Sequence, residues 1–216
     1  MNSENLIEKI TENLNSSEQF DIWDNLQTTD PEYMMYSPRA VGYNSTAEHR
    51  YLMQNILPGF YNGSILDIGC GRADLYKLIQ DLYPDLEFVY RGIDHNPLMT
   101  SLAKEKYGIE CQTGAFETAI LPTADWVVAH GIFTPRRCET EDADLRKLFD
   151  DIDILYKQAT VALSFNLLNP IDTTHYEGFF YVHPGLVLDM LIEKYQSVVL
   201  RNNYSEDTYT VTIYKI

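Results

Sequence analysis

One stretch of the chain, residues 64–75, constrains the fold more than any other. Residues 65–68 are mostly apolar, as in a short strand buried inside a parallel sheet, and the preceding Asn62-Gly63 pair is typical of a turn. A glycine turn follows, and residues 73–82 then have the pattern of a helix. The succession of strand, glycine turn and helix predicts an α/β fold.

The glycine turn also predicts a binding site for a nucleotide-like ligand. Gly69 and Gly71 have no Cβ, so the backbone can adopt positive φ and approach a ligand closely. The sixth position of the dinucleotide pattern G-x-G-x-x-G/A is Asp74, which weakens a pyrophosphate interpretation. Asp67 would repel a pyrophosphate and attract an ammonium or sulfonium group. The turn therefore favours a nucleoside that carries a positive charge.

A second strand supports this prediction. Residues 88–93 read as a strand, and Asp94 stands at its carboxyl end, about 20 positions after the glycine turn, where an acidic residue binds ribose hydroxyls in doubly wound sheets. Asn96 and Pro97 are typical of a helix start, and Gly108 of its end. The rhythm of strand, turn and helix therefore continues.

These motifs resemble those of the class I S-adenosylmethionine-dependent methyltransferases. Residues 66–71 resemble the first motif of that family and Gly92-Ile93-Asp94 the second. The resemblance implies a Rossmann-like, doubly wound, seven-stranded mixed sheet with an antiparallel C-terminal strand, for which residues 195–204 and 208–216 are expected to form the last hairpin. It also implies two parts: an N-terminal extension and lid over residues 1–44, and a methyltransferase domain over residues 45–216.

The resemblance implies S-adenosylmethionine as cofactor and methyl transfer to a small molecule whose identity the sequence does not give. Residues after the third strand are expected near the adenine ring, and His130 is expected at the carboxyl edge of the sheet, where ligand crevices form. His130 is also the catalytic candidate, as a base for a hydroxyl or amine acceptor, although a structural histidine fits the sequence equally well. The expected cofactor-binding residues are Asp67, Gly69, Cys70, Gly71, Asp94, His95, Ala115, Phe116 and His130.

The composition of the chain argues against several kinds of binding partner. The formal net charge of −16, from 32 acidic and 16 basic side chains, argues against a nucleic-acid partner because nucleic-acid binders have a clustered basic face. No apolar run reaches a membrane-spanning length, and a cytoplasmic protein is expected. Cys70, Cys111 and Cys138 show no paired spacing, so free thiols and no metal site are expected.

Three further segments carry expectations. A helix over residues 45–57 is expected to turn Ala47, Tyr51 and Ile56 toward the cofactor. A helix over residues 139–153 is expected to keep its many acidic side chains in solvent. His175 and His183 are expected to flank the last helix, and Asn166 to face the substrate or to cap a turn.

Two other functions remain open. A nicotinamide-dependent oxidoreductase is disfavoured by Asp67, by Asp74 and by the C-terminal hairpin. A non-catalytic module that binds S-adenosylmethionine or a partner is compatible with the lack of an obvious base. Methylation of base amino groups is disfavoured, because residues 130–133, His-Gly-Ile-Phe, stand where such enzymes have an Asn/Asp-Pro-Pro-aromatic turn.

Overall fold

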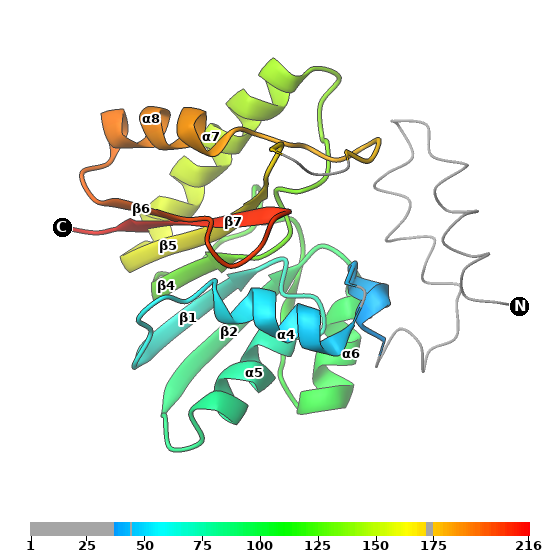
Figure 1. Cartoon of the computed structure of the whole chain (residues 1–216). Helices are drawn as coiled ribbons and strands as arrows, with labels where there is room; N and C mark the ends of the chain where they lie inside the picture. The colour runs from blue at the N-terminus through cyan, green and yellow to red at the C-terminus, as the bar shows by residue number, and fades with distance from the viewer. Residues whose placement is uncertain (1–36, 44, 172–174) are drawn as a thin grey trace, which may run out of the picture.

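The computed structural model describes residues 37–43, 45–171 and 175–216, which build one seven-stranded sheet with helices on both faces (Figure 1). The strands are β1 (Gly63–Ile68), β2 (Phe88–Asp94), β3 (Gln112–Thr113), β4 (Ala124–Ala129), β5 (Ala159–Leu168), β6 (Val198–Arg201) and β7 (Thr208–Tyr214). Their order in the sheet is β3-β2-β1-β4-β5-β7-β6, and β7 runs in the direction opposite to the other six. The predicted mixed sheet with an antiparallel C-terminal strand is confirmed.

The helices form two layers. They are α4 (Thr46–Gln54), α5 (Asp74–Leu82), α6 (Pro97–Tyr107), α7 (Glu141–Gln158) and α8 (Pro184–Lys194), with a short 3-10 helix, η2 (Pro38–Val41), before them. Figure 1 shows α4, α5 and α6 on one side of the sheet and α7 and α8 on the other. Each side has its own buried apolar cluster, one centred on β4, β5, β7 and α7, the other on β1, α4 and α5.

Local sequence signals explain where the helices around the predicted site begin and end. The Asn96 side chain caps α6 by accepting a hydrogen bond from the backbone N–H of Leu98 at 2.9 Å, and Gly108 ends the helix at φ 70°. Ala73, just before α5, has φ 58°, a left-handed conformation that is uncommon outside glycine. Short turns, residues 69–73 and residues 95–96, therefore connect the carboxyl ends of β1 and β2 to the starts of α5 and α6.

The expectation of solvent-exposed acids on the helix now observed as α7 is wrong for two residues. Asp144 and Asp151 are 1% and 0% exposed. Asp144 Oδ1 accepts the backbone N–H groups of Arg137 and Cys138, and Asp151 pairs with Arg137 and Lys147 at 2.6 Å each. Lys147 lies one turn earlier in α7 itself, whereas Arg137 and Cys138 come from the loop before the helix, and the helical period does not reveal these loop contacts.

Two placements around the outer helices also differ from expectation. In α4 the buried residues are His49 and Met53, whereas Tyr51 is half exposed, so the inward face is turned from the one predicted. His175 and His183 both precede α8 instead of flanking it, and His183 is its N-cap. The described helices include none that is both long and apolar enough to cross a membrane. Residues 1–36 of the predicted lid lie outside the described residues, and the division at residue 44 stays a prediction.

Candidate active site

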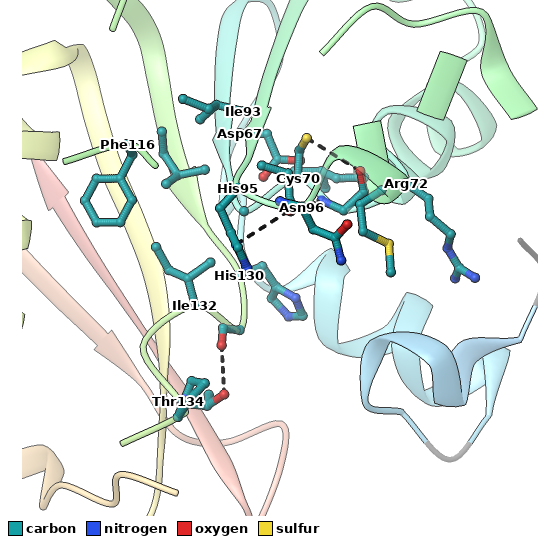
Figure 2. A pocket seen from close by; sticks show the side chains of 18 of the residues that line it. Asp67, Cys70, Arg72, Ile93, His95, Asn96, Phe116, His130, Ile132 and Thr134 are labelled. Carbon is teal, nitrogen blue, oxygen red and sulfur yellow. Dashed lines mark hydrogen bonds and ion pairs between the residues drawn. The ribbon is translucent and has the colours of Figure 1, made fainter. Parts of the chain in front are cut away.

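A cavity of about 420 Å³ opens at the carboxyl ends of β1, β2 and β4. All nine residues expected to bind the cofactor lie on its wall, although no bound molecule tests their roles. Figure 2 shows side chains from the ends of these strands and the following turns converging on the space between them. The sheet topology accounts for this meeting, because neighbouring parallel strands of an open sheet end at the same edge.

The glycine turn after β1 is held by hydrogen bonds to the end of β2. Ile93 O accepts the N–H groups of Gly69 and Cys70 at 2.8 and 3.0 Å, and Asp94 Oδ2 accepts the N–H of Gly71 at 2.8 Å. Both glycines have positive φ, 67° and 52°. A Cβ on Gly69 would lie 2.1 Å from Cγ2 of Ile132, whereas a Cβ on Gly71 would meet nothing within 4 Å. The first glycine is therefore required by packing, and the second borders open space.

Asp94 has a structural role in addition to the one expected. Its Oδ1 accepts the N–H of Asn96 at 2.9 Å, so its two oxygens join the glycine turn to the start of α6. The residue is 8% exposed, and burial raises the pKa of its carboxyl. Each oxygen still has a lone pair for a ligand hydroxyl. The position is consistent with ribose binding while also building the turn.

Asp67 and Asp74 occupy opposite electrostatic environments. Burial raises the pKa of Asp67 to about 7. The 2.5 Å hydrogen bond from the Tyr90 hydroxyl lowers this pKa, but by less than burial raises it. Burial would also raise the pKa of Asp74, but the positive charges of Arg72 and Lys106 outweigh it and lower that pKa to about 2. Asp74 is therefore a fixed anion, while the charge of Asp67 responds to its surroundings near neutral pH.

Arg72 connects the N-terminal segment to the glycine turn. Its side chain is 2% exposed, pairs with Asp74 at 2.7 Å and donates from Nη1 to the carbonyl oxygen of Ser37 at 3.0 Å. Ser37 in turn caps η2 by accepting the N–H of Arg39. This chain of contacts fixes the segment that carries Tyr43 beside the cavity.

A cluster of three rings, Tyr43, His49 and His130, forms one wall of the cavity. The Tyr43 hydroxyl lies 2.9 Å from Nδ1 of His130, and its ring stacks on His49 with centroids 4.2 Å apart. Burial lowers the pKa of His130 to about 3 and that of His49 to about 4, so both imidazoles are neutral at pH 7. His130 was predicted at this edge; His49 was missed, although its spacing of four from Met53 was available as a signal.

Solved structures with this architecture decide the fold family. Magnesium protoporphyrin IX methyltransferase from Synechocystis PCC 6803, solved with bound SAM, matches with a TM-score of 0.61 and 12% identity over 92% of this chain and 97% of that chain. The chain has the class I methyltransferase fold. Its order of elements agrees with the resemblance found in the sequence. No family model matches the chain, and neither does any curated protein.

Two other methyltransferases share the fold. Human N-acetylserotonin methyltransferase in complex with SAM matches with a TM-score of 0.58 and 16% identity over 86% of this chain. Mitomycin 7-O-methyltransferase matches with a TM-score of 0.58 and 18% identity over 90% of this chain. The chain spans 56% and 60% of the lengths of these two proteins, so their additional parts have no counterpart in it.

The far wall of the cavity in this methyltransferase fold is the loop between β4 and α7. Thr134 donates from Oγ1 to Gly131 O at 2.7 Å, and its own carbonyl accepts the N–H of Phe180 at 2.7 Å. Asn166 supports the loop from behind, because its Oδ1 accepts the N–H of Gly131 at 2.7 Å. Asn166 and His175 are not among the lining residues of the cavity. Asn166 thus positions the loop instead of facing a substrate.

Proposed function

We propose that this protein is an S-adenosylmethionine-dependent methyltransferase that acts on a small molecule. The observation that carries the proposal is the junction at one sheet edge of a glycine turn, an acid on the next strand and a neutral aromatic wall, all facing one cavity. The cavity volume of about 420 Å³ falls within the usual range for small-molecule sites, about 300–1,000 Å³. Two of the methyltransferases that share the fold were solved with SAM bound, which supports the same cofactor for this chain.

The residues divide into a cofactor part and an acceptor part. Asp94 is placed to accept hydroxyl hydrogen bonds, and the residues around Asn96 and Phe116 border the side of the cavity expected to hold the adenine. Asp67 offers a carboxylate that gains from a nearby cation. When bound, S-adenosylmethionine supplies a methyl group on a positively charged sulfur. The Tyr43, His49 and His130 cluster then borders the space left for the acceptor.

The low pKa of His130 favours a hydrogen-bonding role over that of a strong base. Protonating an imidazole of pKa about 3 at pH 7 costs about 5 kcal/mol, since each unit is about 1.4 kcal/mol. Burial raises the pKa of Tyr43, so its phenol stays protonated and can donate to Nδ1 of His130. His130 would then present Nε2–H to the cavity as a donor. Such a group orients an acceptor for in-line transfer, which supplies much of the acceleration.

The first test of the proposal is ligand binding. Calorimetric titration and thermal unfolding with S-adenosylmethionine, S-adenosylhomocysteine and NAD compare the wild type with Asp94→Asn and with Asp85→Asn, an exposed acid away from the cavity. We expect the first two ligands to bind and stabilise the wild type and the Asp85 variant, and Asp94→Asn to weaken both. A ligand at 100 times its dissociation constant stabilises the folded state by about 2.7 kcal/mol. If NAD binds and neither S-adenosylmethionine nor S-adenosylhomocysteine does, the proposed methyltransferase function is wrong and an oxidoreductase is favoured.

The second test is turnover. Transfer of a labelled methyl group is followed with a panel of phenols, amines, thiols and carboxylic acids, with Tyr43→Phe beside the wild type. Methylation of any acceptor, with the same product and a slower rate in Tyr43→Phe, supports the enzyme. Tight cofactor binding without transfer to any acceptor favours the non-catalytic module.

A further inference from the structure

Two of the three cysteines meet at the edge of the cavity, although nothing in their spacing predicts it. Cys70 follows β1 in the glycine turn, and Cys111 directly precedes β3. In the β2–β3 pairing Ile93 lies opposite Gln112, which brings Cys111 next to Gly92. In the β1–β2 pairing Asp67 lies opposite Gly92, and Cys70 returns toward the same point through the turn. The two thiols therefore approach β2 from its two neighbouring strands.

Gly92 makes the space that the two sulfurs share. A Cβ built on this residue would lie 2.6 Å from Sγ of Cys70 and 2.7 Å from Sγ of Cys111, both closer than real Cβ contacts. Any larger residue at position 92 would push the sulfurs apart. The two thiols are therefore neighbours across the hydrogen atoms of Gly92, close enough for each to shift the pKa of the other, in opposite directions.

The two cysteines differ in access and acidity. Cys70 is 7% exposed and lines the cavity, whereas Cys111 is half-buried and lies outside the cavity lining. The neighbouring Cys70 thiol lowers the pKa of Cys111, whereas the interaction with Cys111 and burial both raise the pKa of Cys70. A thiolate is the reactive form of cysteine. Cys111 is thus suited to react first with an oxidant from solution, and Cys70 to resolve the product.

We propose that Cys70 and Cys111 form an oxidative modification site, whose disulfide distorts the glycine turn and weakens cofactor binding. The effect on binding rests on the proposed function, while the formation of the bond does not. The oxidant is a peroxide. The Cys111 thiolate attacks one peroxide oxygen, breaking the O–O bond and releasing hydroxide, and becomes a sulfenic acid. Cys70 loses its proton and attacks that sulfur, forming the S–S bond and releasing hydroxide. In sum, two thiols and hydrogen peroxide give one disulfide and two waters.

The disulfide would act on the turn through its geometry. Both thiols are free in this structure, and an S–S bond is only about 2.05 Å long, shorter than any contact between unbonded sulfurs, so its formation draws Cys70 toward Cys111 across Gly92. The backbone N–H of Cys70 donates to Ile93 O at 3.0 Å, and the next N–H, from Gly71, donates to Asp94 at 2.8 Å. Moving Cys70 strains both bonds. The turn and the carboxylate expected to bind ribose would then lose their alignment.

The experiment oxidises the full-length protein with hydrogen peroxide and compares it with Cys111→Ser and with the matched control Cys138→Ser. Peptide mapping by mass spectrometry identifies the bond, and calorimetry measures the affinity for S-adenosylhomocysteine before oxidation, after it and after reduction with dithiothreitol. We expect a Cys70–Cys111 disulfide in the wild type and in Cys138→Ser. We also expect an affinity loss of roughly tenfold or more, about the effect of one lost hydrogen bond to a charged group, reversed by dithiothreitol. Cys111→Ser should keep its affinity under oxidation.

Three results would overturn the inference. The first is a peptide map with other oxidised products and no Cys70–Cys111 bond. The second is a bond that forms without a change in affinity, and the third is a loss of affinity on oxidation in Cys111→Ser as large as in the wild type. A reduced protein that binds no S-adenosylhomocysteine refutes the proposed function instead, and peptide mapping still decides whether the modification site exists.

Discussion

Alanine at Gly69 and alanine at Gly71, the two glycines of the turn after β1, should have different effects on stability and on ligand binding. In Gly69→Ala the new Cβ would overlap Ile132, whose Cγ2 lies 2.1 Å from it, and φ is 67°. Overpacking costs about 1–3 kcal/mol and a left-handed alanine about 1–2 kcal/mol, so we expect a loss of about 2–5 kcal/mol in the free energy of unfolding. In Gly71→Ala only the second cost applies, about 1–2 kcal/mol, because nothing lies within 4 Å of the new Cβ.

For ligand binding, in contrast to stability, Gly71→Ala should have the larger effect of the two variants. The open space beside Gly71 is part of the cavity wall, so a methyl group there would stand in the way of a ligand that approaches the turn. We expect Gly71→Ala to lose less stability than Gly69→Ala and to bind S-adenosylhomocysteine at least roughly tenfold more weakly, a loss of about 1.4 kcal/mol.

Urea unfolding and calorimetry on the two variants measure both quantities. A third protein, Gly69→Ala with Ile132→Ala, removes the atom that the new methyl group would strike, and a double-mutant cycle isolates that contact. We expect the pair to recover at least about 1 kcal/mol relative to the sum of the single changes. If Gly69→Ala costs no more stability than Gly71→Ala, or if the cycle shows no coupling, the assignment of packing to one glycine and ligand approach to the other is refuted.

Three further predictions concern buried polar groups. The pKa of Asp67 is about 7 in the folded state, above its ordinary value of 3.8, so the folded state binds this proton more tightly than the unfolded state does. The free energy of unfolding should therefore fall by up to about 4 kcal/mol as the pH rises from 4 to 7. Urea unfolding at pH 5 and pH 8 should show the fall in the wild type and not in Asp67→Asn. Tyr43→Phe should cost about 1 kcal/mol of stability and change the ¹⁵N shifts of His130 from those of the Nε2–H tautomer, whereas unchanged shifts would contradict the assigned donor. Asp151→Asn removes the carboxylate that pairs with the largely buried Arg137, and we expect it to cost about 3–5 kcal/mol in urea unfolding, whereas the exposed neighbour variant Asp150→Asn should cost less than about 0.5 kcal/mol.

Sequence patterns predicted the sheet because each signal in it is local. The apolar run before Gly69, the acid that ends β2 and the cap at Asn96 each depend on residues a few positions apart, and the structure places all of them as expected. The alternation in residues 208–213 likewise predicted β7. The parallel order of the sheet then follows from the fold that these motifs indicate, because strands joined by helices must run in the same direction.

The contacts that the sequence did not reveal all join distant segments. Tyr43 and His130 are 87 positions apart, and the hydrogen bond between them depends on how η2 and its following residues fold over the sheet edge. The buried acids of α7 were misjudged for the same reason, since Arg137 lies outside the helical period that made Asp151 look exposed. Cys70 and Cys111 meet only through the pairing of both neighbouring strands with β2. Periodicity records which face an element buries and says nothing about its partner.

The three aspartates around the glycine turn, Asp67, Asp74 and Asp94, differ in their partners and therefore in their roles. Asp74 is held as an anion by Arg72 and Lys106, and through Arg72 it fixes the segment that leads to Tyr43. The two carboxyl oxygens of Asp94 accept hydrogen bonds from backbone N–H groups, one in the glycine turn and one at the start of α6. Among the described residues, the Asp67 carboxyl has the Tyr90 hydroxyl as its partner and neither a cation nor a backbone N–H, and its pKa is about 7. A positively charged ligand would favour its ionised form, whereas a neutral one of the same shape would not. The affinity ratio of S-adenosylmethionine to S-adenosylhomocysteine should therefore rise with pH through neutrality, because the charge of Asp67 changes there.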